Sequence, residues 1–382
     1  MTDVLILGGC GMQGKIVAKD LITNGRTVAI GDIQRESGEK FFAKYPDVPF
    51  YEIDLEDVPA TVALIKKVQP KVVANCAEGD WDLNVYKAAL EAGVHVIDLG
   101  SEIPMTKEQL AMGVFFEQDG LIAITGCGST PGVNNVALHY AHAQLDTMDT
   151  VEAGFVWDSN IKEFVVPFSI PSIIEELTDP APYIEHGEWK TAIPLENIEE
   201  REFREIGKQK IFPVRHPETF TFFYYNQNDG MKNMKYFAGF PDHSLYKLME
   251  FIQNGRASEE DIVVDGRETT PVDELTRELR KLPVPAGYTE KENLWLIAKG
   301  TKNGERKEII METIVNTLPG WEDAGCNIDT GMPASIMVQM ILDGRISKPG
   351  SYSPGPIVPT EEFFKELRKR EMVVYCNDKA IN

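Results

Sequence analysis

The chain has 382 residues, of which 43% are hydrophobic and 26% are charged. This composition is typical of a globular protein with a substantial apolar core, and the length exceeds what one core usually supports, so we expect two domains. The 38 Lys and Arg residues against 60 Asp and Glu residues give a formal charge of -22. Such a surface repels nucleic-acid phosphates and anionic lipids, which excludes nucleic acid and membrane as expected partners.

The cysteines and the first residues indicate a compartment. The five cysteines form no Cys-x-x-Cys pair, so we expect neither a disulfide framework nor a zinc knuckle, and no metal site. The chain opens on the apolar run Val4 to Leu7 without a basic signal segment, and no apolar run is long enough to span a bilayer. We therefore expect a cytoplasmic protein.

The first third of the chain alternates short β-branched runs with amphipathic helical stretches. The helical stretches end at glycines such as Gly25 and Gly93, which supply left-handed C-caps. Strands that are apolar throughout and alternate with helices predict a parallel sheet covered on both faces, which is an α/β fold with a Rossmann-type doubly wound sheet. The expected strands are 4–7, 27–30, 50–53, 72–75, 95–99 and 121–125.

The alternation of strands and helices ends after residues 126–132, and the sequence then carries the turn signals of β-hairpins instead of helical crossovers. The clearest is the pair Leu294 to Ala298 and Glu308 to Thr313, which flanks Asn303-Gly304, a dipeptide that favours the primed turns of β-hairpins. The aromatic run from Phe220 to Tyr225 favours a half-buried strand. A second, mainly antiparallel α+β domain is therefore expected.

These patterns predict a discontinuous first domain. We expect residues 1–126 and 335–382 to form the dinucleotide-binding Rossmann domain, because an apolar helix, a Pro/Gly-rich segment and a charged helix follow one another near the C-terminus. Residues 127–334 then form the α+β domain that binds substrate and makes the contacts of a homodimer.

A glycine-rich fingerprint follows the first strand. The stretch from Gly9 to Gly14 reads Gly-Cys-Gly-Met-Gln-Gly, a G-x-G-x-x-G motif that opens a helix, and Asp32 ends the second strand at the expected offset. Gly9 permits the tight turn, Gly11 lets the backbone approach a pyrophosphate at the helix N-terminus, and Gly14 allows close packing of helix on strand. The sequence therefore predicts a dinucleotide site.

Asp32 predicts which dinucleotide binds. Its carboxylate would accept hydrogen bonds from the ribose hydroxyls and repel a 2′-phosphate, which favours NAD, whereas Arg35 nearby leaves NADP as the alternative. Asp54 ends the third strand, where it would contact adenine or cap a helix. The other cofactor contacts expected near the strand ends and the glycine turn are Met12, Gln13, Ile33, Cys76 and Ala77.

Several stretches together resemble the saccharopine dehydrogenase family. Asp98-Leu99-Gly100-Ser101 follows the fifth strand, a Thr130-Pro131-Gly132-Val133-Asn134-Asn135 turn follows the sixth, and Thr330 to Ser335 precedes the apolar helix. The chain is most similar to the lysine 6-dehydrogenase-like branch of that family. The resemblance implies a Rossmann domain, an α+β substrate domain and NAD(P)-dependent chemistry at a C–N bond.

The candidate catalytic residues follow from what such chemistry requires, which is a general base and groups that fix the substrate's charges. Asp98 would orient or deprotonate an amine, or else anchor its loop. His216 and Glu218 flank a proline and supply a group that titrates near neutrality, and Arg215 would hold a carboxylate, unless the segment is an exposed loop. Thr130 and Asn134 complete the expected substrate site.

Three functions fit these features. The leading one is oxidative deamination of an amino acid or amino-acid-derived amine, as in lysine 6-dehydrogenase. The alternatives are an NADPH-dependent reductive condensation like that of a saccharopine reductase, and a catalytically silent dinucleotide sensor. Convergence of Asp98, Asn134 and Arg215 on one cleft would favour an enzyme over the sensor.

Overall fold

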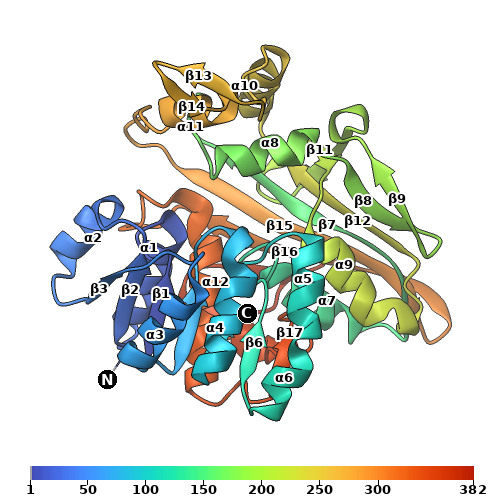
Figure 1. Ribbon diagram of the computed structural model, residues 1–382. Helices are drawn as coiled ribbons and strands as arrows, with labels where there is room; N and C mark the ends of the chain where they lie inside the picture. Colours follow the sequence, from blue (N-terminus) through green and yellow to red (C-terminus); the bar gives the residue numbers. More distant parts are fainter. Residues whose placement is uncertain (1) are drawn as a thin grey trace.

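The computed structural model describes residues 2–382 and contains two large sheets with helices packed between and around them (Figure 1). The first sheet has the strand order β17-β6-β5-β4-β1-β2-β3, and all its neighbouring strands are parallel. Apart from β17, this is the Rossmann order, so the predicted doubly wound α/β fold is confirmed. The strands are β1 (Val4–Leu7), β2 (Val28–Asp32), β3 (Phe50–Glu52), β4 (Val72–Asn75), β5 (His95–Ile97), β6 (Ile122–Ile124) and β17 (Gly350–Tyr352).

Helices cover both faces of this sheet because every residue of β1 is buried and alternate residues face opposite cores. Helices α1 and α12 lie side by side on one face, and α3 packs against α4 on the other. The helices that surround the sheet are α1 (Met12–Thr23), α2 (Glu39–Lys44), α3 (Val58–Val68), α4 (Asp82–Ala92), α5 (Ile103–Ala111), α6 (Gly113–Gln118) and α12 (Ile328–Leu342).

The second sheet is mixed but mainly antiparallel, as predicted. Among the described residues its one parallel pairing joins β7 and β12. Its strands are β7 (Thr147–Ser159), β8 (Ala181–Glu185), β9 (Glu188–Ala192), β10 (Glu199–Phe203), β11 (Gly207–Pro213), β12 (Asn233–Gly239), β15 (Glu290–Lys302), β16 (Glu305–Asn316), β18 (Val373–Cys376) and β19 (Lys379–Ala380).

The remaining helices belong to this part of the chain or connect the two sheets. They are α7 (Val133–His142), α8 (Ile170–Thr178), α9 (Pro217–Asn226), α10 (Asp242–Gln253), α11 (Pro271–Leu279) and α13 (Thr360–Lys369). A small hairpin of β13 (Ile262–Val264) and β14 (Arg267–Thr269) lies between α10 and α11. The 3-10 turns are η1 (Glu36–Gly38), η2 (Gly79–Trp81), η3 (Pro194–Glu196), η4 (Gln227–Asp229) and η5 (Gly325–Asn327).

The predicted hairpin is confirmed, and the predicted aromatic strand is wrong. Strands β15 and β16 pair from Lys302 and Glu305 outward, with positive φ angles at Asn303 (53°) and Gly304 (81°), which a primed turn requires. The run from Phe220 to Tyr225 is part of helix α9 instead. Pro217 at the helix start and an acidic residue in the first turn both favour a helix N-terminus there, so local capping outweighs the aromatic pattern.

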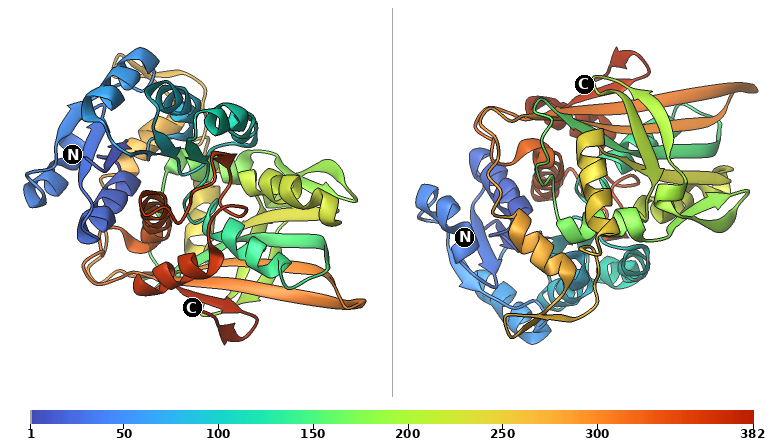
Figure 2. Two further views of the ribbon diagram at one scale, coloured as in Figure 1. Left: turned by 90° about the horizontal axis from the view of Figure 1, so that it is seen from below. Right: turned by 90° about the horizontal axis from the view of Figure 1, so that it is seen from above.

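The C-terminal segment contacts both sheets (Figure 2). Strand β17 extends the first sheet beside β6, and Arg370 reaches across to α1, where its Nη2 donates to Oδ2 of buried Asp20 at 2.7 Å. Strands β18 and β19, however, join the second sheet at β16. The prediction that all of 335–382 belongs to the first domain is therefore wrong for these strands, because the exposed edge of the long β16 offers them a partner. The boundaries at 126 and 334 stay a prediction.

No helix in the described part of the chain is long and apolar enough to cross a bilayer.

Candidate active site

The glycine turn between β1 and α1 has the close contacts that a dinucleotide motif requires. A β-carbon added at Gly14 would lie 2.4 Å from the carbonyl oxygen of Gly8, and one at Gly9 would lie 2.6 Å from Cγ2 of Ile30. At Gly11, the N-cap of α1, an added β-carbon would meet within 4 Å only the Gly8 oxygen, at 3.2 Å, among the described residues. The open side of Gly11 fits a pyrophosphate at the helix N-terminus.

Asp32 lies at the end of β2, beside this turn. Its Oδ2 accepts a hydrogen bond from the backbone nitrogen of Cys10 at 2.8 Å, and Oδ1 accepts one from the nitrogen of Gln34 at 3.3 Å. The side chain of Ile33, the next residue, is 62% exposed, and the guanidinium of Arg35 stacks on the ring of Phe42 at 4.2 Å. The turn therefore presents one anion and one nearby cation to the adenosine end of a dinucleotide.

The other predicted cofactor residues lie along the same edge of the sheet, and Asp54 differs from the prediction in one respect. The backbone of Cys76 and Ala77 packs on Gly8, and Met12 is exposed at the start of α1. Asp54 does not cap α3, because Asp57 does so by accepting from the nitrogen of Ala60 at 2.9 Å. Asp54 instead accepts from the nitrogen of Glu56 at 3.0 Å, and its contact with adenine stays a prediction.

Asp98 is placed differently from the predicted catalytic role. It is completely buried and lines neither of the cavities described below. Its Oδ1 accepts from the backbone nitrogens of Gly100 and Gly126, and its Oδ2 accepts from Nε2 of Gln109, all at 2.7 Å. With both oxygens occupied by donors, Asp98 ties two loops together. The expectation that it deprotonates an amine is therefore corrected in favour of the loop anchor.

A large cavity of about 680 Å³ separates the two sheets. Residues 78–80 and 99–105, which follow β4 and β5, form one wall. Residues of α8 and residues 215–217 before α9 form the opposite wall. Because the carboxyl ends of parallel strands are where open α/β sheets bind ligands, this cavity is the candidate site for the reactive end of a dinucleotide and for a substrate.

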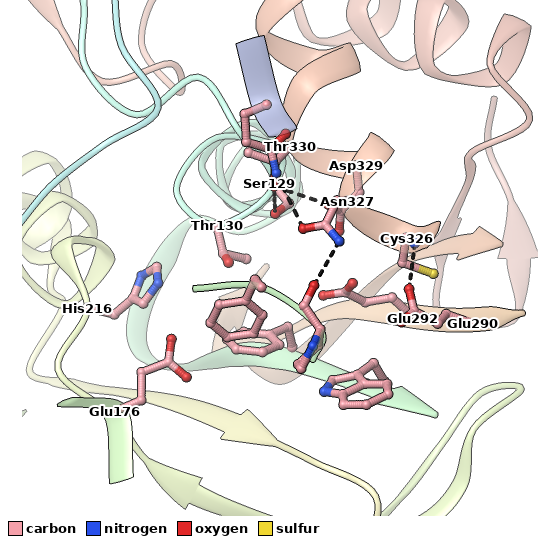
Figure 3. A pocket seen from close by; sticks show the side chains of 15 residues that line it. Ser129, Thr130, Glu176, His216, Glu290, Glu292, Cys326, Asn327, Asp329 and Thr330 are labelled. Atoms are coloured by element: carbon pink, nitrogen blue, oxygen red, sulfur yellow. Dashed lines mark hydrogen bonds between the residues drawn. The ribbon is translucent and has the colours of Figure 1, made fainter. Parts of the chain in front are cut away.

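A second, smaller cavity of about 200 Å³ adjoins it, as Thr130, Glu176 and His216 line both (Figure 3). Four carboxylates and three aromatic side chains dominate its lining, and His216 is the only basic residue among the described residues that line it. The carboxylates are Glu176, Glu290, Glu292 and Asp329, and the aromatic residues are Phe155, Trp157 and Phe168.

His216 lies where the two cavities meet. Its Nδ1 is in hydrogen-bond contact with Oε2 of Glu218, a completely buried residue, and its ring stacks on that of Tyr236 with centroids 4.4 Å apart. Burial opposes the charged imidazolium, but the carboxylate of Glu218, assisted by Glu176, outweighs it and raises the pKa of His216. His216 and Glu218, named from the sequence only as residues that flank a proline, are thus paired and buried rather than part of an exposed loop, and their catalytic role stays a prediction.

Asn134 acts behind this group. It is buried, lines neither cavity, and donates through Nδ2 to the carbonyl oxygen of Gly154 and to the hydroxyl of Tyr236, both at 3.2 Å. Asn134 therefore reaches the site only through Tyr236, on which His216 stacks, and not by contact with a substrate as we expected.

Arg215 lines the larger cavity and is already surrounded by carboxylates. Its Nη2 contacts Glu102 of the first domain and lies 2.9 Å from Oδ2 of Asp179 and 3.8 Å from Oε2 of Glu175. The side chain is 31% exposed. Of Asp98, Asn134 and Arg215, only Arg215 lines a cavity, so the expected convergence of these three residues on one cleft is wrong.

The carboxylates of the smaller cavity are strongly perturbed. Burial raises the pKa of Glu176 to about 8 and that of Asp329 to about 7. Burial and then the charge of Asp329 hold the pKa of Glu292 well above its usual range. Burial also raises the pKa of Glu290, whose oxygens accept from the hydroxyl of Tyr288 at 3.0 Å and from the nitrogen of Cys326 at 2.8 Å.

Sequence reasoning missed these four carboxylates. Glu290 and Glu292 alternate on one face of β15, just before the predicted strand at Leu294, and acidic residues at alternate positions entering a buried strand were the available signal. Gln13, predicted to contact the cofactor, also lines this cavity, and its Nε2 donates to Oδ1 of Asn327 at 3.4 Å. Within residues 2–382 no group of three or more His, Cys, Asp or Glu side chains is arranged to hold a metal ion.

Two family models match the chain almost end to end. The saccharopine dehydrogenase NADP binding domain matches residues 4–124, and the saccharopine dehydrogenase C-terminal domain matches residues 128–373. Among solved structures, saccharopine dehydrogenase (L-Glu forming) from Saccharomyces cerevisiae has a TM-score of 0.76 and 13% sequence identity, covering 98% of this chain and 100% of that one. This likeness shows a shared fold.

Two curated relatives are similar over nearly their whole lengths. Carboxynorspermidine synthase from Vibrio alginolyticus is 26% identical in an alignment that covers 91% of this chain and 89% of the relative. Carboxyaminopropylagmatine dehydrogenase from Synechocystis sp. is 24% identical in an alignment that covers 92% of each chain.

Proposed function

The chain belongs to the saccharopine dehydrogenase family, and from that premise we propose that it catalyses the reductive condensation of a primary amine with a carbonyl compound that bears a carboxylate. The coarser function is plain from its relatives: it is an NAD(P)-dependent oxidoreductase. In the proposed reaction the amine and the carbonyl compound lose water to give an imine. The imine then takes up a hydride and a proton to become a secondary amine.

One observation carries this proposal, namely that two cavities of different character meet at His216. The smaller cavity combines four carboxylates with aromatic rings, which suits an ammonium-bearing chain. The larger one is also acidic but contains Arg215, whose contacts with Glu102 and Asp179 a substrate carboxylate would replace. A condensation needs two substrates whose reacting ends meet at an acid–base group. The arrangement around His216 has this form.

His216 would supply the proton that the condensation needs. When the tetrahedral adduct of amine and carbonyl collapses, the departing hydroxide must be protonated, and an imidazolium held charged by Glu218 can donate that proton. Thr130, which lines both cavities, is placed to hydrogen-bond the reacting oxygen or nitrogen. Asn134 and Tyr236 fix the plane of the imidazole and are positioning residues.

Gly11 and Asp32 would hold the dinucleotide, at the pyrophosphate and the adenosine ribose respectively. When bound, the reduced dinucleotide supplies the hydride. The loops that follow β4 and β5 form the wall of the larger cavity and would shield the reacting atoms from water. The preference for NAD over NADP stays part of the proposal, with Asp32 as its reason.

The relatives favour condensation over the deamination that leads the sequence-based hypotheses. The names of both relatives describe a carboxyl-bearing amine, which is the product class of a reductive condensation. Lysine 6-dehydrogenase-like deamination is the second candidate, because the same groups would catalyse the reverse reaction, which is the oxidation of an amine. A silent sensor has no need of the perturbed groups around His216.

A steady-state assay tests the proposal. The purified protein is given NADH or NADPH with diamines or lysine, together with the ω-aldehyde of an α-amino acid or a 2-keto acid, and consumption of reduced cofactor is followed by absorbance. We expect turnover only when an amine and a carbonyl compound are both present, with a product whose mass is that of the two substrates minus water plus two hydrogens. Turnover of NAD and lysine alone would favour deamination instead.

The proposal extends to assembly and location. We propose a homodimer formed through the second domain and a cytoplasmic enzyme, because the five free cysteines suit a reducing compartment. Light scattering during gel filtration measures the mass of the assembly, and a single-subunit mass would contradict the dimer.

A further inference from the structure

The smaller cavity has two chemically distinct ends. Figure 3 shows His216 and Glu176 on one side, and Glu290, Glu292 and Asp329 on the other. The first end opens to the larger cavity, where the condensation is proposed to occur. The second end is remote from it and needs an explanation that the reaction does not supply.

Asp329 is aimed into this remote end without a partner for one of its oxygens. It is the second residue of α12 and is 3% exposed, and its Oδ1 accepts from the hydroxyl of Thr330 at 3.1 Å. Its Oδ2 is buried without a partner of ordinary hydrogen-bond geometry among residues 2–382, and the carboxyls of Asp329 and Glu292 lie close enough for a hydrogen bond between them to affect both pKa values. The indole nitrogen of Trp157, which lines the same cavity, is likewise buried without an acceptor in the described chain. Unsatisfied buried groups of this kind indicate a missing ligand.

Glu292 supplies the second carboxylate. It lies directly opposite Trp157 in the pairing of β15 with β7, and the groups that perturb its pKa are all carboxyls: Asp329, Glu290 and Glu176. Glu290 differs, because both of its oxygens accept hydrogen bonds from the protein and hold the η5 turn. The carboxylate oxygens that are available to bind a cation at the remote end therefore belong to Glu292 and Asp329.

We propose that Glu292 and Asp329 bind the second ammonium group of a diamine substrate whose first amine reacts beside His216. This inference rests on the proposed function and assigns to these two residues the choice of diamines over monoamines. The aromatic wall between the two ends suits the methylene chain of such a substrate, and the face of Trp157 adds attraction for a cation.

Binding should release a proton. Because the pKa of Asp329 is raised to about 7, that of Glu292 is held well above its usual range, and the two carboxyls are hydrogen-bonded to each other, the pair retains a proton near neutral pH. The groups that face the pair are Glu290 from β15, Glu176 from α8, Cys326 from η5, and the hydroxyls of Ser129 and Thr330. Among the described lining residues there is no lysine or arginine that would pair with these two carboxylates in place of a substrate ammonium group. An ammonium ion favours the doubly ionised pair and displaces the proton.

The test compares diamines with matched monoamines, using putrescine against butylamine and diaminopropane against propylamine. In the unmodified enzyme we expect kcat/KM for the diamine to exceed that for the monoamine by about 100-fold, because one fully desolvated charge pair is lost with the monoamine. The isosteric variants E292Q and D329N should reduce this ratio to below about 10-fold. The matched control E290Q should retain it, because Glu290 has no free oxygen.

Calorimetry separates this inference from the proposed function. Putrescine binding is measured without any carbonyl substrate, in two buffers of different ionisation enthalpy near neutral pH. We expect proton release in the unmodified protein and its loss in D329N and E292Q. Turnover with equal preference for both amine types, or unchanged discrimination in these variants, would overturn the subsite while leaving the condensation intact. Absence of turnover with every amine would contradict the condensation, and the subsite would then stand or fall on the calorimetry alone.

Discussion

The glycine turn and the acidic cavity adjoin each other at Gln13, yet they are built in opposite ways. The turn consists of residues contiguous in sequence, and its binding surface is backbone held open by the absence of side chains. The acidic cavity consists of side chains brought together from α8, the start of α9, β15 and α12, which are spread over residues 170–342. The turn can therefore be disrupted only by adding atoms, whereas the cavity can be changed by removing single charges.

Asp98 belongs to neither region, and its removal is expected to have the largest effect. Asp98→Ala leaves the backbone nitrogens of Gly100 and Gly126 and the amide of Gln109 without their acceptor in a fully buried place. We expect the free energy of unfolding to fall by about 3 to 5 kcal/mol, since each unsatisfied buried donor carries a desolvation penalty. Urea denaturation followed by circular dichroism measures this.

Thr125→Val is the matched control for Asp98→Ala. It removes a hydroxyl that donates to the same carboxylate at 3.2 Å or to Oε1 of Gln109 at 2.9 Å, leaves both glycine nitrogens paired, and should cost only about 1 kcal/mol. If Asp98→Ala unfolded at the same urea concentration as the unmodified protein but had lost turnover, Asp98 would regain the catalytic role that its strand-end position suggests.

The turn itself is tested by a pair of glycine variants. Gly11→Val should weaken dinucleotide binding by about 100-fold or more with the fold intact, because the new side chain occupies the side on which a pyrophosphate approaches. Gly14→Val should instead prevent folding, since its β-carbon would lie 2.4 Å from the Gly8 oxygen and 2.5 Å from Cα of Gly9. Titration by fluorescence and thermal unfolding distinguish the two. A folded Gly11→Val variant with full affinity would reduce the motif to a turn.

The same contrast explains how much the sequence could predict. The parallel sheet, the glycine turn and the β15–β16 hairpin depend on local patterns, namely apolar strands, the G-x-G-x-x-G spacing and Asn303-Gly304, and each is present. The pairing of His216 with Glu218 was also predictable, because the two are separated by a single proline at a helix start.

The acidic cavity was not predictable, because nothing in the sequence joins Glu176 to Asp329 across about 150 residues of chain. Asp98 shows the opposite failure. A carboxylate at the end of a parallel strand has the same sequence signature whether it faces a ligand or two loop amides, and only the packing of residues 99–101 and 125–127 decides between them. The pairing of β18 with β16 likewise depends on which sheet edge is open.

The next test removes the charge of Glu218, which contacts His216, and its expected effect is smaller. Because Glu218 raises the pKa of His216, the imidazolium required for proton donation persists to higher pH than in an ordinary histidine and is lost as pH rises through that pKa. Glu218→Gln should therefore lower kcat by about 10- to 100-fold and move the alkaline decline of activity to lower pH. A pH profile of kcat measures both effects.

His216→Gln supplies the comparison for Glu218→Gln. It should lower kcat at least as much and remove the alkaline decline altogether, because no imidazole remains to titrate. An alkaline decline that stays at the same pH in Glu218→Gln would assign the titration to another group, of which Glu176 is the first to examine, as its pKa is about 8.

The smallest expected effect is at Asp32, where a charge acts on a backbone-defined site. Asp32→Asn keeps an acceptor for the nitrogen of Cys10 and thus the turn, but removes the charge that opposes a 2′-phosphate. We expect the ratio of the NADP and NAD dissociation constants to fall by about 10-fold, mostly through tighter NADP binding. Asp32→Ser, which removes the side chain's reach to the ribose as well, should also weaken NAD. Arg35→Ala is the control, since it removes the cation stacked on Phe42 and should loosen NADP alone. If the unmodified protein binds NADP more tightly than NAD, the charge of Asp32 does not decide the choice, and Arg35 is then the residue that must account for it.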